Sequence, residues 1–363
     1  MIKRFHPYKI DVTELSIYIT NRCNKKCKHC FINQNNDEVK PEWIQWVMSN
    51  FPNITKAVIV GGEPTICKTF PEIVKILKEN DVKITMSTNC QWMRWDKRKK
   101  KPSPDEKGIT DVLDMIKDID SIQISIEGSK KTTDEIRGKG TYDDCMGAVD
   151  LLKKNKFDVF FRATYSNNNF NEIPSMLELA TEKKVHLILF PYKGRDSIPL
   201  SNEAQELLYN KLLEYTSKGG ERLAIANIPQ YYTYIGQHGY CPAGRNIINI
   251  IPDGTITPCE MNMPPDHYPL AKFKNNGNLM DKDFLLKRMQ TFLEEVKKID
   301  QECMTCKHHP TCRSGCHETR EYMDCPLKYN VDYEVSVDYA VNKKDMRIKK
   351  RAMKKIMNKR KGC

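Results

Sequence analysis

The sequence lacks any long apolar run. No stretch of its 363 residues approaches the roughly 20 consecutive apolar residues that a membrane-spanning helix requires. The first residues, Met-Ile-Lys-Arg-Phe-His, are partly basic but lack the apolar segment of a secretory signal peptide. An internal sequence repeat is also missing. We therefore expect a protein that does not enter membranes and that is located in the cytoplasm.

Little net charge lies in the body of the chain. The net charge is +12, but residues 343–363 hold eleven Lys and Arg against one acid, so residues 1–342 carry only +2. A basic segment of this kind can bind nucleic acid or an acidic peptide, or it can be one solvated face of a helix. The pattern predicts a basic amphipathic helix over 338–363, with nucleic acid as a candidate partner.

Cysteine, by contrast, is abundant. Fourteen cysteines are many for a chain expected in a reducing compartment, where disulfides seldom persist. Regular spacing between cysteines favours ligation of a metal or a cluster instead. Ten of the fourteen fall into two regularly spaced groups, and the others are Cys67, Cys90, Cys145 and Cys363.

Short β-rich runs alternate with apolar-periodic helical runs through residues 12–190. This alternation predicts parallel strands joined by crossover helices. Six such units are too few for a closed eight-unit barrel, so we expect an α/β fold, a partial (β/α)6 barrel over 12–215. After about residue 236 Gly, Pro, Cys and His become frequent and helical periodicity fades, which predicts a small cysteine-rich domain over 236–330. The expected strands cover 15–20, 57–60, 83–87, 121–126, 159–164 and 186–190, and the expected helices cover 42–49, 70–79, 108–116, 142–154, 171–182 and 201–216.

The first cysteine group follows the first expected strand. Cys23, Cys27 and Cys30 have the spacing C-x3-C-x2-C. Three thiolates on one short loop can hold three irons of a cubane cluster and leave the fourth iron open. Structural zinc is the alternative, but it normally takes four ligands in C-x2-C pairs, and His29 is poorly placed beside Cys30. The spacing therefore favours an iron–sulfur cluster.

This motif, followed by the aromatic Phe31, resembles the radical S-adenosylmethionine (radical SAM) superfamily. The segment Gly61-Gly62-Glu63-Pro64 ends the second expected strand and is similar to the family's GGEP motif, which contacts the amino group of SAM. Glycines at such a place let the backbone approach a ligand closely. The resemblance implies that SAM chelates the open iron and that electron transfer from the cluster yields a 5′-deoxyadenosyl radical.

Further positions carry the same resemblance. Ser87 and Asn89 end the third expected strand as in related members. Ser125 and Arg137 match positions that hold the SAM carboxylate or ribose, and Phe190 lies where the adenine is often bound. Two departures stand out, since many relatives have Asp at the position of Glu127 and Gly at that of Cys90.

The second cysteine group resembles the SPASM extension of that superfamily. Its tight part has the spacing C-x2-C-x5-C-x3-C, and two cysteines precede it while one follows. The resemblance implies two auxiliary 4Fe-4S clusters, hence three clusters in all, although zinc remains an alternative. No further cysteine lies in residues 242–249, so the nearer auxiliary cluster would have an open iron or a ligand from elsewhere. The distal cluster would use Cys303, Cys306, Cys312 and Cys325, and the nearer one Cys241, Cys259 and Cys316.

Three residues are candidates for catalysis. Glu260 follows Cys259, where sulfatase-maturating relatives have an Asp proposed as the base, and it is otherwise a surface or salt-bridged Glu. Cys67 and Cys90 lie just after strand ends, where a thiol could donate a hydrogen atom to a substrate radical. Free cysteines are also common as small buried hydrophobic residues.

The resemblance implies a radical SAM oxidoreductase that modifies a peptide or protein side chain by a crosslink, a thioether or formylglycine formation. A small-molecule enzyme acting on a sugar or cofactor precursor is the second hypothesis, and a nucleic-acid modifier using the basic tail is the third. Only eleven residues precede the expected barrel at 12–215. A leader-recognition domain is therefore expected to be absent, and a separate leader-binding protein is an expected partner. Flavodoxin or ferredoxin is the expected electron donor.

Overall fold

The computed structural model describes residues 9–93, 95–96, 101–102, 106–192, 200–205, 208, 223–225, 241–262, 268–274, 280–296 and 305. The chain divides into two compact units. The first unit contains Met1–Ile126, Thr133–Phe160 and Pro242–Lys298, and the second contains Glu127–Thr132, Phe161–Cys241 and Ile299–Cys363.

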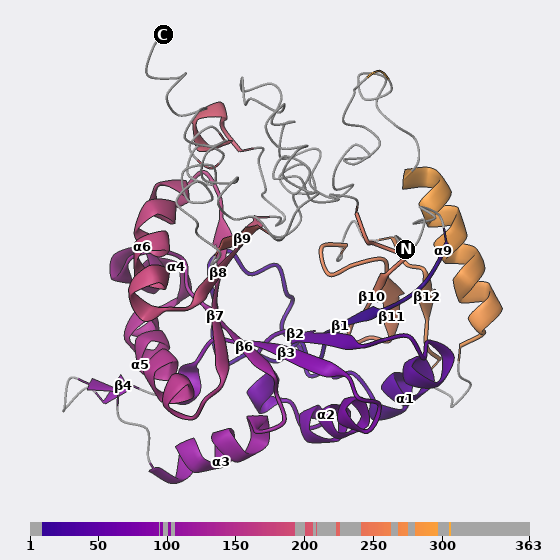
Figure 1. Ribbon diagram of the computed structural model, residues 1–363, viewed down its shortest axis with the longest axis horizontal. Coiled ribbons are helices and arrows are strands. Elements are labelled where there is room, and N and C mark those ends of the chain that lie inside the picture. Colours follow the sequence, from indigo (N-terminus) through magenta and orange to yellow (C-terminus); the bar gives the residue numbers. More distant parts are fainter. Residues whose placement is uncertain are drawn as a thin grey trace, which may run out of the picture. The chain divides into compact units, whose positions relative to one another are not determined.

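The first unit is built on a mostly parallel sheet (Figure 1). Its strands are β1 (Glu14–Tyr18), β2 (Lys56–Val60), β3 (Lys83–Thr88), β6 (Ser121–Ser125), β10 (Ile247–Ile250), β11 (Thr255–Thr257) and β12 (Ala271–Lys272). They follow the order β12-β11-β10-β1-β2-β3-β6. Strands β10, β1, β2, β3 and β6 run parallel, whereas β11 and β12 are antiparallel to their neighbours. The carboxyl ends of the parallel strands therefore share one edge of the sheet.

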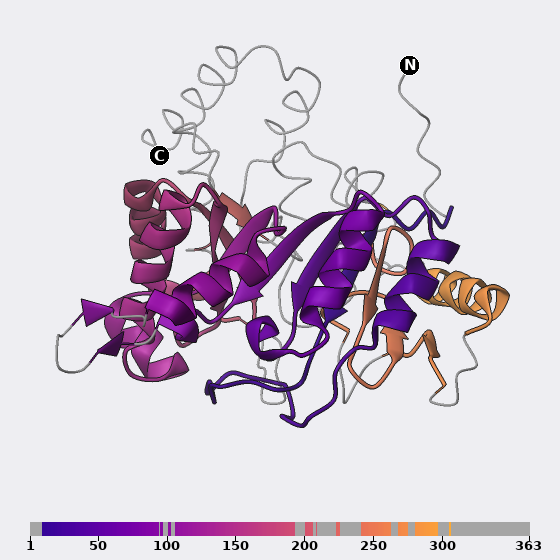
Figure 2. The same ribbon diagram turned by 90° about the horizontal axis from the view of Figure 1, so that it is seen from below.

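Helices cover one face of this sheet. Figure 1 and Figure 2 both show α1 and α2 lying on the same side of strands β1–β3. Both helices begin with a proline in the first turn, where its missing N–H costs no hydrogen bond. The helices of this unit are α1 (Pro41–Asn50), α2 (Phe70–Glu79), α3 (Glu106–Ile116), α5 (Thr141–Lys154) and α9 (Lys282–Val296), with 3₁₀ turns at Pro64–Ile66 and Gln91–Met93. A small hairpin joins β4 (Trp95–Asp96) to β5 (Lys101–Pro102).

The two faces of the sheet differ in chemistry. Successive side chains on a strand point to opposite faces, and every second residue here is apolar and buried. Leu15, Ile17 and Ile59 have no exposed surface on the helix-covered face. Most of the alternate positions carry polar side chains, including Ser16 on β1 and Asn249 on β10, although Val58 and Val60 of β2 lie on the same face. A parallel sheet that is purely structural is apolar on both faces, so the polar face is available for a site.

The second unit continues the α/β pattern. Strand β7 (Asp158–Tyr165) begins in the first unit and ends in the second, and α4 (Lys130–Arg137) begins in the second and ends in the first. Within the second unit β8 (His186–Pro191) pairs in parallel with β9 (Leu223–Ile225), and α6 (Ile173–Lys183) packs on β8. A 3₁₀ turn at Phe170–Glu172 precedes α6.

The predicted α/β class and parallel strands are confirmed. Each of the six expected strands is present within one or two residues of its predicted bounds, and five of the expected helices are present as well. The predicted loss of helical periodicity after residue 236 is wrong for α9, where Leu285, Met289, Phe292 and Leu293 form a buried stripe. Helix α4 and strands β10–β12 were not expected. Most of the expected helix at 201–216, five cysteines of the second group and the basic tail at 338–363 lie outside the described residues.

Within the part of the chain that the structure describes, no helix is long and apolar enough to cross a membrane.

Candidate active site

The first cysteine group lies on the loop that leaves the carboxyl end of β1. The Cys23 sulfur accepts a hydrogen bond from the Lys25 backbone N–H at 3.4 Å. The Cys30 backbone N–H donates to the Cys27 carbonyl at 3.1 Å, which folds the loop back on itself. Cys30 is exposed, whereas Cys23 and Cys27 are half-buried. The loop thus gathers three thiols at the edge of the sheet where the parallel strands end.

The surroundings of Cys23 keep its thiol protonated unless a cation binds to it. The pKa of Cys23 is raised to about 11, first by burial and further by Glu63, Cys27 and Cys30, against the opposing Lys25 N–H. Such a thiol becomes a ligand only when a bound cation displaces its proton. Three thiols on one short loop are a donor set that suits a cubane cluster with one open iron.

The two glycines after β2 lie against this cysteine loop. The Gly62 N–H donates to the Thr20 carbonyl at 2.7 Å, and the Glu63 N–H donates to the Arg22 carbonyl at 2.9 Å. A Cβ at Gly62 would lie 1.8 Å from the Arg22 carbonyl oxygen, much closer than two non-bonded atoms can approach. Gly61 adopts φ +134°, which side chains rarely tolerate. The structure therefore requires both glycines for close approach of two backbone segments.

Glu63 is buried and is held by four donors. Its Oε1 atom accepts from the Thr65 N–H at 3.3 Å, the Thr65 hydroxyl at 2.7 Å and the Thr88 hydroxyl at 2.9 Å. Among the described residues, its Oε2 atom accepts only the Asn89 N–H, at 2.8 Å. Burial raises the pKa of Glu63, and the hydrogen bonds from Asn89, Thr65 and Thr88 oppose that rise. A carboxylate has about four acceptor positions, so Oε2 keeps capacity for an ammonium group.

The other predicted SAM contacts are divided between the two units. Ser87 and Ser125 alternate with buried apolar residues and lie on the polar face of the sheet, where the Ser87 hydroxyl donates to Gln123 at 2.8 Å. Arg137 is half-buried at the end of α4. Phe190 belongs to the second unit, where the Arg162 guanidinium lies 3.8 Å from the centre of its ring. The first unit therefore brings the cysteine loop, the glycines, Glu63 and Asn89 together.

Cys67 and Cys90 are both buried thiols. The Cys67 S–H lies 3.8 Å from the Ile19 carbonyl and 3.3 Å from the Thr69 hydroxyl, and burial raises its pKa. Cys90 has φ +58° and packs against Cys145 of α5. Burial and then the Cys145 thiol raise the pKa of Cys90 well above its usual value. These contacts lie in the packed interior, and a catalytic role for either thiol stays a prediction.

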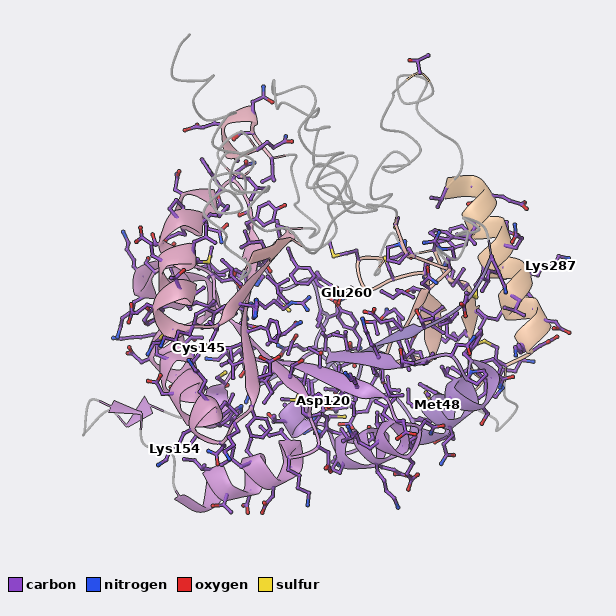
Figure 3. The ribbon with its side chains drawn as sticks, in the orientation of Figure 1. Met48, Asp120, Cys145, Lys154, Glu260 and Lys287 are labelled. Carbon is purple, nitrogen blue, oxygen red and sulfur yellow. The ribbon has the colours of Figure 1, made fainter. Side chains whose placement is uncertain are left out.

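Glu260 lies on the loop that follows β11. Its backbone carbonyl accepts from the Tyr18 hydroxyl at 3.5 Å, and the Tyr18 ring lies 6.0 Å from the ring of Phe31 in the cysteine loop. Figure 3 shows Glu260 and Met48 of α1 on opposite sides of β1, so Glu260 lies on the polar side of the sheet. The carbonyl of the preceding Cys259 accepts from Thr257 Oγ1 at 3.1 Å. Sequence reasoning missed Tyr18, although its alternation with Ile17 could have placed it on the polar face.

The structure describes two of the seven cysteines that are predicted to bind auxiliary clusters. Cys241 is described in the second unit and Cys259 in the first. Cys303, Cys306, Cys312, Cys316 and Cys325 lie outside the described residues.

Comparison with known proteins identifies the domain that carries the loop. The chain matches the radical SAM superfamily over residues 17–180. Residues 17–180 form a radical SAM domain. The chain is 28% identical to Fe-coproporphyrin III synthase of Methanosarcina barkeri over 218 residues, covering 56% of this chain and 51% of that protein. It is 22% identical to mycofactocin maturase MftC of Mycolicibacterium smegmatis over 85% of this chain and 79% of the maturase.

A solved structure agrees on the fold. The native anSMEcpe structure with bound AdoMet and Cp18Cys peptide superposes with a TM-score of 0.67, at 16% identity, over 96% of this chain and 99% of that one. A radical SAM domain uses S-adenosylmethionine and a 4Fe-4S cluster. Cys23, Cys27 and Cys30, which lie on the loop after β1 in this domain, stay the predicted ligands of that cluster.

Proposed function

We propose that this radical SAM enzyme modifies a peptide or protein side chain oxidatively and that its SPASM extension holds two auxiliary 4Fe-4S clusters. The observation that carries the proposal is the position of Glu260 on the polar face. Tyr18 is hydrogen-bonded to Glu260 and also packs on Phe31, so one side chain contacts both the cysteine loop and the segment of the predicted base. The names of MftC and of the peptide-bound anSMEcpe structure support a peptide substrate.

The residues divide the work of the reaction. When bound, the cluster and SAM would supply the radical chemistry that removes a hydrogen atom from the substrate. Cys23, Cys27 and Cys30 would hold the cluster. Glu63 binds the SAM ammonium through Oε2, the oxygen with spare acceptor capacity. Glu260 would take the proton, and an auxiliary cluster the electron, that the substrate radical releases as it is oxidised.

The polar face positions the substrate. Paired side chains cross it between neighbouring strands, with Ser87 donating to Gln123 at 2.8 Å and Asn249 donating to Thr257 at 3.0 Å. Such neutral hydroxyl and amide groups suit the amides of a peptide backbone. Their pairing fixes the side chains before substrate arrives, which lowers the entropic cost of orientation.

A small-molecule substrate is the second candidate, and one observation favours it. The relative with 28% identity is a coproporphyrin synthase, a higher identity than that of the peptide maturase. That alignment covers 56% of this chain, whereas the maturase alignment covers 85%. The broader alignment is the reason for placing the peptide first.

The test begins with anaerobic reconstitution and counts of iron and sulfide. We expect about twelve irons in the intact protein and about eight after Cys23, Cys27 and Cys30 are changed to Ala, as for three 4Fe-4S clusters. Four or fewer irons in the intact protein would contradict the auxiliary clusters, and zinc in place of iron would overturn the enzyme assignment.

The second arm of the test addresses the substrate. Reduced protein is given SAM with either synthetic peptides encoded by short reading frames beside its gene or an iron porphyrin. We expect 5′-deoxyadenosine to rise above its substrate-free level with a peptide, together with a two-hydrogen mass loss in that peptide. A rise only with the porphyrin would reverse the order of the two candidates. A leader-binding protein and flavodoxin or ferredoxin stay predicted partners, to be added in the same assay.

A further inference from the structure

Asn89 contacts both halves of the candidate site. It follows β3 directly and is 5% exposed. Its backbone N–H donates to Glu63 Oε2 at 2.8 Å. Its side-chain Nδ2 donates to the Cys23 sulfur at 3.6 Å and to Asn24 Oδ1 at 2.8 Å. One residue thus touches the carboxylate proposed to bind SAM and a thiol proposed to bind iron.

The orientation of the Asn89 amide is fixed by its neighbours. Its Oδ1 atom accepts the Gln91 N–H at 2.9 Å, which leaves Nδ2 to face the cysteine loop. A flipped amide would bring Oδ1 against the Asn24 oxygen and lose both bonds. The donor is therefore held toward Cys23 before any cluster binds.

We propose that Asn89 is a positioning residue that sets the ease of reduction of the cluster and couples it to the SAM site. This inference rests on the proposed function. A hydrogen bond to a cluster sulfur stabilises the reduced, more negative state, and it acts strongly where water is excluded. The second donor to Cys23 is the Lys25 backbone N–H, which substitution at Asn89 leaves in place.

The coupling runs through Glu63. Within the part of the chain that the structure describes, the Asn89 N–H is the one donor to Oε2, while Oε1 already accepts three hydrogen bonds. An ammonium group bound at Glu63 Oε2 would share that oxygen with the Asn89 N–H. It would therefore change the charge distribution of the Asn89 peptide group. The same residue carries the amide that faces Cys23, so SAM binding reaches the cluster by a path of two hydrogen bonds in addition to the expected chelation of the open iron.

The experiment measures the midpoint potential of the cluster by EPR-monitored titration, with and without SAM, in the reconstituted full-length protein. The variants are Asn89→Ala, which removes the donor, and Asn89→Asp, which replaces it by an acceptor of the same size. Asn80→Ala is the matched control, because its Nδ2 donates only to the Ile76 carbonyl at the end of α2. The signal is assigned by its absence in Cys30→Ala.

We expect Asn89→Ala to disfavour reduction about tenfold, which for a one-electron couple is about 59 mV. Asn89→Asp should shift the potential further in the same direction, and the shift caused by SAM should shrink in both variants. Asn80→Ala should match the wild type. A wild-type potential in Asn89→Ala would overturn the inference while leaving the proposed function intact.

Two outcomes separate this inference from the function on which it rests. If the wild-type protein takes up no cluster whose signal changes with SAM, the proposed function itself fails. If Asn89→Ala does not fold, Asn24→Ala gives the answer, since Asn24 is exposed and anchors the same amide. It should cause a smaller shift of the same sign, and an unchanged potential in that variant would also overturn the inference.

Discussion

The backbone N–H of Lys28 donates to the carbonyl of Ile136 at 2.9 Å. This bond ties the middle of the cysteine loop to α4, and the Lys25 ammonium donates to the Thr141 hydroxyl at 2.8 Å beside it. The ion pair between Lys28 and Glu135 is exposed and adds little. Backbone contacts therefore hold the loop in place, which favours a cluster site that is ordered before iron arrives.

Gly62→Ala should abolish SAM binding and destabilise the protein. The added Cβ would lie 1.8 Å from the Arg22 carbonyl oxygen, so the two backbone segments must separate. We expect a loss of about 2–3 kcal/mol in unfolding free energy, as for other overpacked sites. Urea denaturation and equilibrium dialysis with SAM check this. Gly138→Ala is the control, because its Cβ meets no atom within 4 Å and only its positive φ opposes the change.

Asp144→Asn should stabilise the protein at neutral pH. Burial raises the pKa of Asp144 to about 6, against the attraction of Lys25, and its Oδ1 has no hydrogen-bond partner among the residues that the structure describes. The stability that the protonated Asp144 carboxyl contributes is fully present below the pKa that Asp144 has in the unfolded chain. It is lost as pH rises through about 6.

The gain from Asp144→Asn should be about 1–3 kcal/mol at pH 7 and smaller at pH 5, because one pKa unit corresponds to about 1.4 kcal/mol. Denaturation at both pH values measures it. Asp150→Asn, at an exposed position on the same helix, should show no such difference between pH values. Equal effects of the two substitutions would contradict the prediction.

Cys90 and Cys145 should resist alkylation in the folded, cluster-free protein. Both side chains are fully buried, and the thiolate that alkylating reagents attack is disfavoured at Cys90. Cys30 is exposed and should react first. Timed iodoacetamide labelling under anaerobic conditions, followed by peptide mass spectrometry, gives the order. Labelling of Cys90 at the rate of Cys30 would show that the interior opens readily.

Glu172→Gln should weaken the start of α4. The Glu172 carboxylate accepts from the Ser129 N–H at 2.7 Å, from the Ser129 hydroxyl at 3.0 Å and from the Thr132 hydroxyl. Burial by itself raises the pKa of Glu172, but the hydrogen bonds from Thr132 and Ser129 have the larger combined effect, so the pKa is lowered.

The stability that Glu172 contributes is present above its unfolded pKa and is lost as pH falls through the lower folded value. We expect Glu172→Gln to cost about 1–2 kcal/mol at pH 7 by urea denaturation, as for other lost charge-assisted caps. The cost should fall in acid. Exposed Glu178→Gln on α6 is the control and should be nearly neutral.

Local pattern was enough to predict most of the sheet. The alternation of Leu15 and Ile17 with Ser16 predicts a strand with one apolar face, and Gly61 and Gly62 predict close backbone approach. Helix α4 was missed because its residues are mostly polar, although Ser129 is a typical residue before a helix. Helix α9 is indicated in the sequence by apolar residues at helical spacing, Leu285, Met289, Phe292 and Leu293.

The remaining features depend on distant residues. Thr88 lies 25 residues from Glu63, and no local pattern predicts their hydrogen bond. Cys145 lies on a helix whose spacing predicts a core position but not a neighbouring thiol. The pairing of β1 with β10 places Glu14 beside Ile247. Sequence periodicity cannot predict this pairing, because the residues of a strand do not show which other strand lies next to it.

That pairing has a consequence for how the protein is made. Ribosomes add about 5–20 residues per second, so β10 emerges roughly 10–50 seconds after β1. During that interval the edge of β1 that will pair with β10 has no partner, although the cysteine loop that follows β1 has already been synthesised. An unpaired strand edge is a template for association with other chains. A chaperone or cluster-delivery protein that shields the nascent chain until residue 250 has emerged would protect both the strand and the thiols that follow it.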